Sequence, residues 1–231
     1  MIKDALHSLL HLFFPHQCAG CGNDIIDDQQ LLCLQCIEQL PVTGFHRHAN
    51  NPVEKIFDGR LPLHNAAAYM YFAKNSLLQQ LIHQFKYKGN KEIGEYFGRR
   101  MGESIMQCNR FKKIDALVPL PLYISRERKR GYNQAAILCR GIAETIKVPV
   151  LNNVVIRNKA TQTQTRKDRV QRWQNMEGMF GVADAAAIQN KHILLVDDVV
   201  TTGATLEACG QALLSAGPAF LSIYTMAYSL K

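Results

Sequence analysis

The chain has 231 residues, of which 47% are hydrophobic and 20% charged, a composition that predicts a soluble, globular protein with one large domain, or one domain plus a small module. The net charge of +8 favours anionic partners such as nucleotides, phosphosugars or nucleic acid, although general solubility explains the charge equally well. No apolar run reaches the ~20 residues that span a bilayer, which excludes an integral membrane segment from the interpretation.

Residues 1–14 open the chain with apolar side chains at helical spacing, which predicts an amphipathic helix packed on the protein. Contact with a membrane or a partner is the alternative. A signal peptide is disfavoured because Asp4, His7 and His11 interrupt the apolar run and no small-residue cleavage site follows it.

Two Cys-x-x-Cys pairs come next, Cys18 with Cys21 and Cys33 with Cys36. Each pair can direct two thiolates at one centre, so together they predict a closed, four-thiolate zinc site with a structural role. A redox or disulfide role and an iron–sulfur cluster are the alternatives. The other three cysteines stand singly in helical or apolar segments, as reduced cysteines do, which favours a cytoplasmic protein.

A loop rich in Pro, Gly, His and Asn, from about residue 41 to 52, separates the cysteine pairs from the rest. We therefore expect an N-terminal helix and zinc module over residues 1–50 and a second domain over residues 51–231. The pattern predicts strands over 65–73, 114–120, 153–157, 192–196 and 219–227, and helices over 75–86, 90–107, 133–147 and 203–216. Alternation of strands with helices indicates an α/β fold with a parallel sheet and flanking helices.

A double acid, Asp197-Asp198, ends the apolar run at 192–196 and is followed by a turn that opens a helix. Ligands of an open parallel sheet sit beyond the carboxyl ends of its strands. The turn offers backbone N–H groups and hydroxyls to an anion, and its residues are Thr201, Thr202, Gly203, Ala204 and Thr205. Because carboxylates would repel a phosphate, they are expected to accept hydrogen bonds from sugar hydroxyls or to support Mg²⁺. The pattern therefore predicts a site for a ribose 5-phosphate.

The segment VDDVVTTGAT resembles the binding motif for phosphoribosyl pyrophosphate (PRPP) of type I phosphoribosyltransferases. The resemblance implies that Asp197 and Asp198 contact the ribose hydroxyls, and that residues 201–205 bind the 5-phosphate.

Two basic segments complete the pattern. Residues 118–135 follow a predicted strand and carry four cations in five residues, which indicates a second anion site, suited to pyrophosphate; a basic, solvated loop is the alternative. Residues 157–180 interleave cations with Thr and Gln, as in a mobile lid. The candidate pyrophosphate and lid residues are Arg126, Arg128, Lys129, Arg130, Gly131, Asn133, Gln134, Arg157, Gln164 and Arg172.

The whole arrangement is similar to the ComF family of competence-associated, phosphoribosyltransferase-like proteins. That family shows an N-terminal four-cysteine knuckle, a Phe-Lys-Tyr/Phe-x-Gly segment (here residues 85–89), Val-Pro-x-Pro with Arg-Gly-Phe-Asn-Gln, and the double-acid turn. In this chain Tyr132 takes the place of the Phe after Gly131. The resemblance implies a role in natural transformation, DNA uptake or DNA utilisation, with competence or recombination proteins and single-stranded DNA as partners.

The expected activity is a pentosyl (glycosyl) transfer from PRPP with Mg²⁺ to an acceptor that the sequence does not identify. A non-catalytic, PRPP-sensing adaptor that handles single-stranded DNA is one alternative, and a nucleobase-salvage phosphoribosyltransferase is another.

Overall fold

The computed structural model describes residues 16–24, 30–158 and 178–229. Four parallel strands form the central sheet in the order β1-β6-β5-β2. The strands are β1 Asn65–Phe72, β2 Ala116–Pro119, β5 His192–Val200 and β6 Phe220–Ser229. The residues from Ile193 to Val196 are fully buried, as in a parallel sheet that is covered on both faces. The predicted α/β fold is confirmed.

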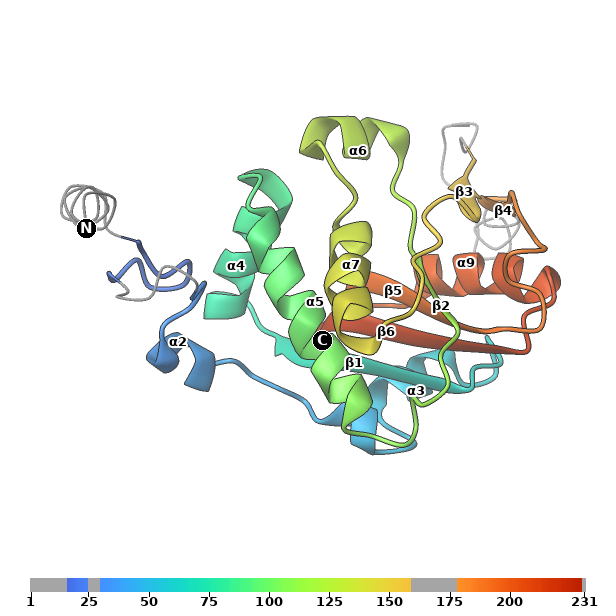
Figure 1. The fold of residues 1–231 in the computed structure, drawn as a ribbon, viewed down its shortest axis with the longest axis horizontal. Helices are drawn as coiled ribbons and strands as arrows, with labels where there is room; N and C mark the ends of the chain where they lie inside the picture. Colours follow the sequence, from blue (N-terminus) through green and yellow to red (C-terminus); the bar gives the residue numbers. More distant parts are fainter. Residues whose placement is uncertain (1–15, 25–29, 159–177, 230–231) are drawn as a thin grey trace, which may run out of the picture.

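Helices cover both faces of this sheet (Figure 1). The helices are α2 Leu34–Glu38, η1 Phe45–Arg47, α3 Pro52–Phe57, α4 Leu77–Tyr87, α5 Lys91–Met106, α6 Ile124–Arg130, α7 Gln134–Ile146 and α9 Ala204–Ser215. On β6, the Tyr224 hydroxyl lies 2.7 Å from Ser104 of α5, whereas Leu221 packs near Gly210 of α9. Because positions an odd number apart point to opposite faces of a strand, α5 and α9 cover opposite faces.

Strand β5 is longer than expected and contains both acids of the double-acid motif. Its pairing with β6 continues from His192–Phe220 through Asp197–Thr225 to Val200–Tyr228. The sequence prediction ended the strand at residue 196 because polar residues follow there, and the neighbouring strand overrides that local signal. Asp197 and Asp198 therefore lie within the last four residues of the strand rather than in a loop.

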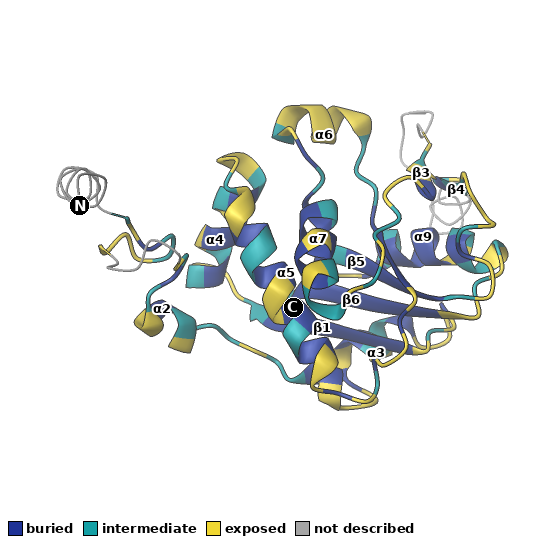
Figure 2. Cartoon of the chain, viewed as in Figure 1, coloured by how far each residue is buried: buried dark blue, intermediate teal, exposed yellow. Residues whose placement is uncertain are grey.

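Two further segments differ from the prediction. The strand expected near residue 155 does not join the main sheet: β3 (Val155–Arg157) pairs antiparallel with β4 (Phe180–Val182). The basic segment 118–135, in which no helix was predicted before residue 133, contains the helix α6, which Gly131 ends with φ 80°. Helix α6 has no buried residue, and Figure 2 shows it projecting with an exposed surface. Its sequence therefore contains no apolar periodicity from which a helix could be predicted.

Residues 41–43 run beside β1, with the Tyr71 N–H donating to the Pro41 carbonyl at 2.8 Å. The domain boundary at residue 50 stays a prediction. In the part of the chain that the structure describes, none of the helices has the length and apolar character needed to cross a membrane. The helix expected over residues 1–14 and the candidate lid residues Gln164 and Arg172 lie outside the described residues.

Candidate functional site

The candidate site lies at the carboxyl edge of the sheet, where β2 and β5 end. Asp197 and Asp198 are successive residues of β5, so their side chains leave the strand on opposite faces. Asp198 is nearly buried and forms an ion pair with Lys86 of α4, whose Nζ lies 2.6 Å from Oδ2. The carboxylate of Asp197 accepts the backbone N–H of Asp198 at 2.8 Å.

The surroundings of Asp197 favour its protonated form. Burial and the negative charge of Asp198 raise the pKa of Asp197 to about 8, and they outweigh the Asp198 N–H and the cations Lys86 and Arg157, which lower it. The two acids are therefore inequivalent: Asp198 has Lys86 as its ion-pair partner, whereas the surroundings of Asp197 oppose its ionisation. A ligand hydroxyl or a cation that favours the ionised form of Asp197 would displace its proton.

The loop after β5 turns the chain sharply into α9. Gly203 has φ 74°, and a Cβ at this position would lie 2.6 Å from Cγ2 of Ile56, so only glycine fits without strain. No side chain caps the first turn of α9. The N–H groups at this helix end therefore remain available to an anion, as the sequence prediction requires.

A cavity of about 390 Å³ adjoins this loop, and Ile56, Arg60, Thr201, Thr202 and Tyr228 line it. Arg60 fixes one wall. Its guanidinium donates to the carbonyl of Thr202 at 3.2 Å and forms an ion pair with Glu207 of α9. Both threonines are exposed at this opening.

Arg157 is a predicted pyrophosphate residue that the structure brings to the site. Its guanidinium stacks 3.9 Å from the ring centroid of Tyr123 and 5.2 Å from that of Phe180. Burial lowers the pKa of Arg157, and Asp197 is among the charges that act on it. Its Nε is buried without a hydrogen-bond partner among the described residues, and its Nη2 lies 3.7 Å from Sδ of Met179.

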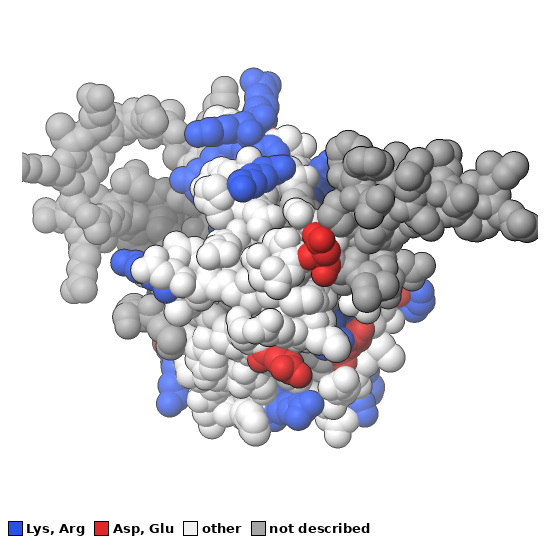
Figure 3. Space-filling model, turned by 90° about the vertical axis from the view of Figure 1, so that its left-hand side faces the viewer, with Lys and Arg blue, Asp and Glu red and all other residues white. Residues whose placement is uncertain are grey.

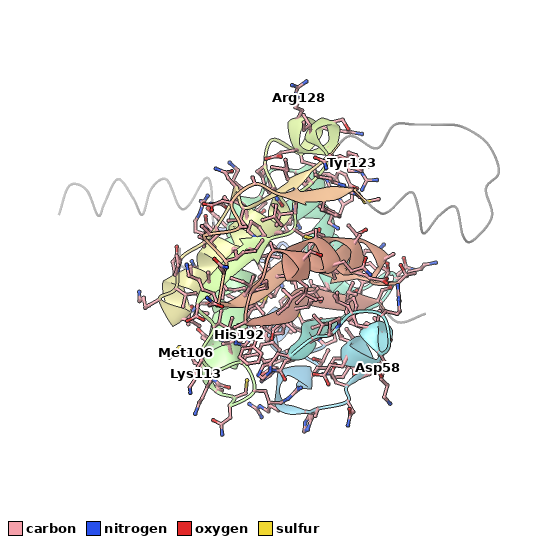
Figure 4. The ribbon with its side chains drawn as sticks, turned by 90° about the vertical axis from the view of Figure 1, so that its right-hand side faces the viewer. Asp58, Met106, Lys113, Tyr123, Arg128 and His192 are labelled. Carbon is pink, nitrogen blue, oxygen red and sulfur yellow. The ribbon has the colours of Figure 1, made fainter. Side chains whose placement is uncertain are left out.

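Helix α6 divides the other predicted cations. Arg126 is among the charges that act on Arg157, whereas Figure 4 shows Arg128 at the tip of the helix, pointing away from the sheet. Lys129 is exposed. Arg130 donates to Gln134 at 2.7 Å. The structure therefore brings Arg126 toward the site and leaves Arg128 outside it.

The polar residues after α6 hold the backbone around the site. Asn133 accepts the N–H of Ala135 at 3.0 Å, which caps α7, and its amide donates to the Leu120 carbonyl at 3.0 Å. Gln134 is buried. Gly131 supplies the left-handed turn between the two helices. These residues link the end of β2 to α7, and a direct role in binding stays a prediction.

Three residues near the site were not predicted from the sequence: Lys86, Arg60 and Tyr123. Lys86 stands within the quoted Phe-Lys-Tyr-x-Gly segment, which was the available signal. Arg60 is 142 residues from Thr202 in the chain, and no local pattern reports such a contact. Tyr123 lies at the base of α6 (Figure 4) and acts through its ring face.

The four cysteines form a separate cluster that packs beside α4, next to Leu77 and Gln84. The Sγ atoms of Cys18, Cys21, Cys33 and Cys36 all lie within 4.8 Å of one another. Burial alone would raise the pKa of Cys18, but hydrogen bonds from the backbone N–H groups of Cys33, Cys21 and Gly20 lower it to about 6. The donor set and its convergence fit a tetrahedral metal such as zinc.

Comparison with known proteins identifies the family. The model of the phosphoribosyl transferase domain matches residues 109–230, which include β2, α6, β5 and the loop into α9. The chain belongs to this family.

The curated relatives of this phosphoribosyltransferase-family chain confirm the resemblance to ComF proteins. Competence protein F of Haemophilus influenzae is 26% identical over 93% of this chain and 98% of that protein. The DNA utilization protein YhgH of Escherichia coli is 28% identical over 92% of this chain and 90% of that protein. Competence protein ComFC of Bacillus subtilis is 28% identical over 94% of this chain and 86% of that protein. Among solved structures, a glutamine PRPP amidotransferase from Bacillus subtilis aligns with 15% identity and a TM-score of 0.43, over 62% of this chain and 30% of that one.

Proposed function

We propose that this phosphoribosyltransferase-family protein binds PRPP together with Mg²⁺ and transfers its phosphoribosyl group to an acceptor, as part of DNA uptake or utilisation. The observation that supports this most directly is the run from Asp197 and Asp198 into the uncapped N-terminus of α9. Carboxylates and an anion-binding helix end lie side by side there, as a sugar phosphate requires. The names of the relatives support the connection to DNA.

The residues would divide the ligand between them. The N–H groups and hydroxyls of residues 201–205 would hold the 5-phosphate, and Asp197 and Asp198 would accept hydrogen bonds from the ribose hydroxyls. Arg157 and Arg126 would lie toward the pyrophosphate. Mg²⁺, held with PRPP near the two acids, would supply positive charge that balances the pyrophosphate.

In the reaction, the bond from the anomeric carbon to the pyrophosphate oxygen breaks, and a bond to the acceptor's nucleophilic atom forms. Positive charge develops on the sugar as the leaving group departs. The ionised Asp198 offsets this charge, and Arg157 stabilises the negative charge that collects on the leaving oxygen. The acceptor's proton leaves with solvent or pyrophosphate.

Calorimetric titration with PRPP and Mg²⁺ tests the binding step. We expect Asp197→Asn with Asp198→Asn to weaken binding at least tenfold, because each charged hydrogen bond contributes about 1.5–3 kcal/mol. The charge-matched control is Glu144→Gln with Asp184→Asn, whose carboxylates are exposed and do not line the cavity. Equal affinity in the two double variants would refute the assignment.

A second measurement separates transfer from sensing. Pyrophosphate release is followed with PRPP, Mg²⁺ and, in turn, free nucleobases, nucleosides and single-stranded DNA. Release that depends on an acceptor supports transfer, and release with free nucleobases alone supports a salvage enzyme. PRPP binding without acceptor-dependent release supports a PRPP-sensing adaptor instead.

A further inference from the structure

An exposed aromatic ring stands among cations where α4 meets α6. Tyr87, the last residue of α4, has 59% of its surface exposed. The guanidinium of Arg130 lies 5.6 Å from the centroid of its ring, and the His83 ring lies 5.1 Å away. An exposed tyrosine ring leaves apolar surface in contact with water, so a planar partner that stacks on this ring would be favoured.

The neighbouring turn fixes the position of this ring. The Tyr132 hydroxyl donates to the carbonyl of Phe85, and the two rings lie 5.9 Å apart. Lys91, at the start of α5, places its Nζ 5.2 Å from the Tyr132 ring centroid. The end of α4, the end of α6 and the start of α5 are therefore held together as one platform.

Cations surround this platform. We name the α4–α6 surface after its residues, which are Tyr87, Lys88, Lys91, Arg128, Lys129 and Arg130. Within the described residues, no ion pair engages any of these cations. Figure 3 shows Lys and Arg side chains gathered at the end of the molecule where Figure 1 places α6. The acids Glu92 and Glu127 lie on the same helices, and four exposed cations outnumber them.

We propose that the α4–α6 surface binds single-stranded DNA, with a base stacked on Tyr87 and the adjoining phosphates contacting Lys88, Lys91 and Arg128. A single strand exposes the faces of its bases, whereas a duplex keeps them stacked inside, so an exposed tyrosine selects the unpaired form. Cations spread around the ring match a backbone that carries one charge per nucleotide. This inference rests on the DNA-handling part of the proposed function and gives it a location outside the PRPP site.

Fluorescence anisotropy with a labelled 20-nucleotide oligothymidine tests the charges. Lys88→Glu with Lys91→Glu is expected to weaken binding at least tenfold and to flatten its salt dependence, because about two phosphate contacts are lost. Glu at position 91 begins a helix, where a negative charge is favourable. The matched control, Lys112→Glu with Lys113→Glu, makes the same charge change at the opposite end of the molecule, where Figure 4 labels Lys113. Equal weakening in both variants would reduce the effect to net charge and overturn the proposal.

Two DNA oligonucleotides, one with bases and one abasic, separate the contribution of base stacking from that of charge. Tyr87→Leu is expected to weaken binding of the oligothymidine about fivefold or more, while Tyr87→Phe keeps wild-type affinity, because a stacked base contributes about 1–3 kcal/mol. An abasic strand with the same phosphates should bind Tyr87→Leu and wild type equally. If Tyr87→Leu weakens both strands alike, or if a duplex binds as tightly as the single strand, the stacking assignment fails.

A PRPP titration of the same proteins keeps the two proposals apart. Wild-type protein that binds the oligothymidine but not PRPP would refute the PRPP site and leave the α4–α6 surface standing. Wild-type protein that binds PRPP but not the oligothymidine would refute the surface alone.

Discussion

Asp197 and Asp198 are neighbours in the chain but occupy different electrostatic surroundings. Asp198 faces Lys86 at 2.6 Å. Asp197 has the backbone N–H of Asp198 as its near donor, and its charge acts on Cys209 of α9. The motif predicts both acids at the strand end, but the split between them depends on α4 and α9, which contact opposite faces of β5.

The raised pKa of Asp197 predicts how stability depends on pH. The pKa is about 8 in the folded chain against an ordinary value of 3.8, so between these values the folded state holds a proton that the unfolded state has released. The contribution of Asp197 to the free energy of unfolding is therefore complete below about pH 4 and is lost as the pH rises to about 8, a loss on the order of 5 kcal/mol at about 1.36 kcal/mol for each pKa unit. Urea unfolding between pH 5 and pH 8 measures this slope.

Asp197→Asn removes the titrating group and retains its size. The variant should gain stability relative to wild type as the pH rises, and the difference should be smallest near pH 5. Asp184→Asn, at an exposed position, should run parallel to wild type. A constant difference between wild type and Asp197→Asn across this range would contradict the assignment.

At the scale of elements, α5 and α7 cross at a pair of glycines. A Cβ at Gly98 would lie 2.5 Å from the Leu138 carbonyl oxygen and 2.9 Å from the Gly141 Cα. A Cβ at Gly141 would lie 2.5 Å from the Glu95 carbonyl oxygen. These neighbours are backbone atoms, which cannot move aside as a flexible side chain can. The close crossing fixes how near α7 lies to α5. The first turn of α7 follows Asn133.

Gly98→Ala is therefore expected to destabilise the protein by about 3 kcal/mol through overpacking. This sign is opposite to the intrinsic preference, because Ala in a helix is favoured over Gly by about 1 kcal/mol. Urea unfolding measures the difference. Arg99→Ala, at an exposed site on the next residue, loses only a surface ion pair with Glu144 and should change stability by less than about 1 kcal/mol. A stabilised Gly98→Ala variant would contradict this prediction, because it would show that α5 and α7 can move apart at little cost.

The same two helices show which elements a sequence can predict. Residues 90–107 and 133–147 were expected as helices that begin after the capping residues Asn90 and Asn133, and α5 and α7 confirm the helices. Helix α6 has no buried residue, so the apolar periodicity of the sequence does not predict it. The extra length of β5 comes from its pairing with β6, which is information that no local window contains.

For the whole molecule, motif order predicted the family and the edge of the sheet that carries the site. It did not predict the tertiary partners that shape the site. Lys86 reaches Asp198 from α4, and Arg60 reaches the loop before α9 from the segment between α3 and β1. Such pairs form only when the sheet brings distant segments together, so residue types and spacing cannot specify them.

The cysteine cluster joins the rest of the molecule through α4. The amide of Gln84 donates to the Ala19 carbonyl at 2.7 Å. A Cβ at Gly20 would lie 2.8 Å from Sγ of Cys36 and 2.9 Å from Cδ1 of Leu77. Residues 18–21 therefore lie along α4, from its first residue Leu77 to Gln84, two residues before Lys86. Loss of order in the cluster should reach the first turns of α4 before it reaches the sheet.

Removal of the predicted zinc tests this connection. Wild-type protein should contain one zinc per chain by elemental analysis, and Cys36→Ser should contain almost none, since it removes one of four thiolates. Hydrogen exchange should then rise in residues 30–40 and at the start of α4, while β5 and β6 stay protected. Cys108→Ser, at a buried cysteine outside the cluster, is the matched control and should keep its zinc. Exchange that rises equally in the sheet would make the cluster part of the main core rather than a module resting on α4.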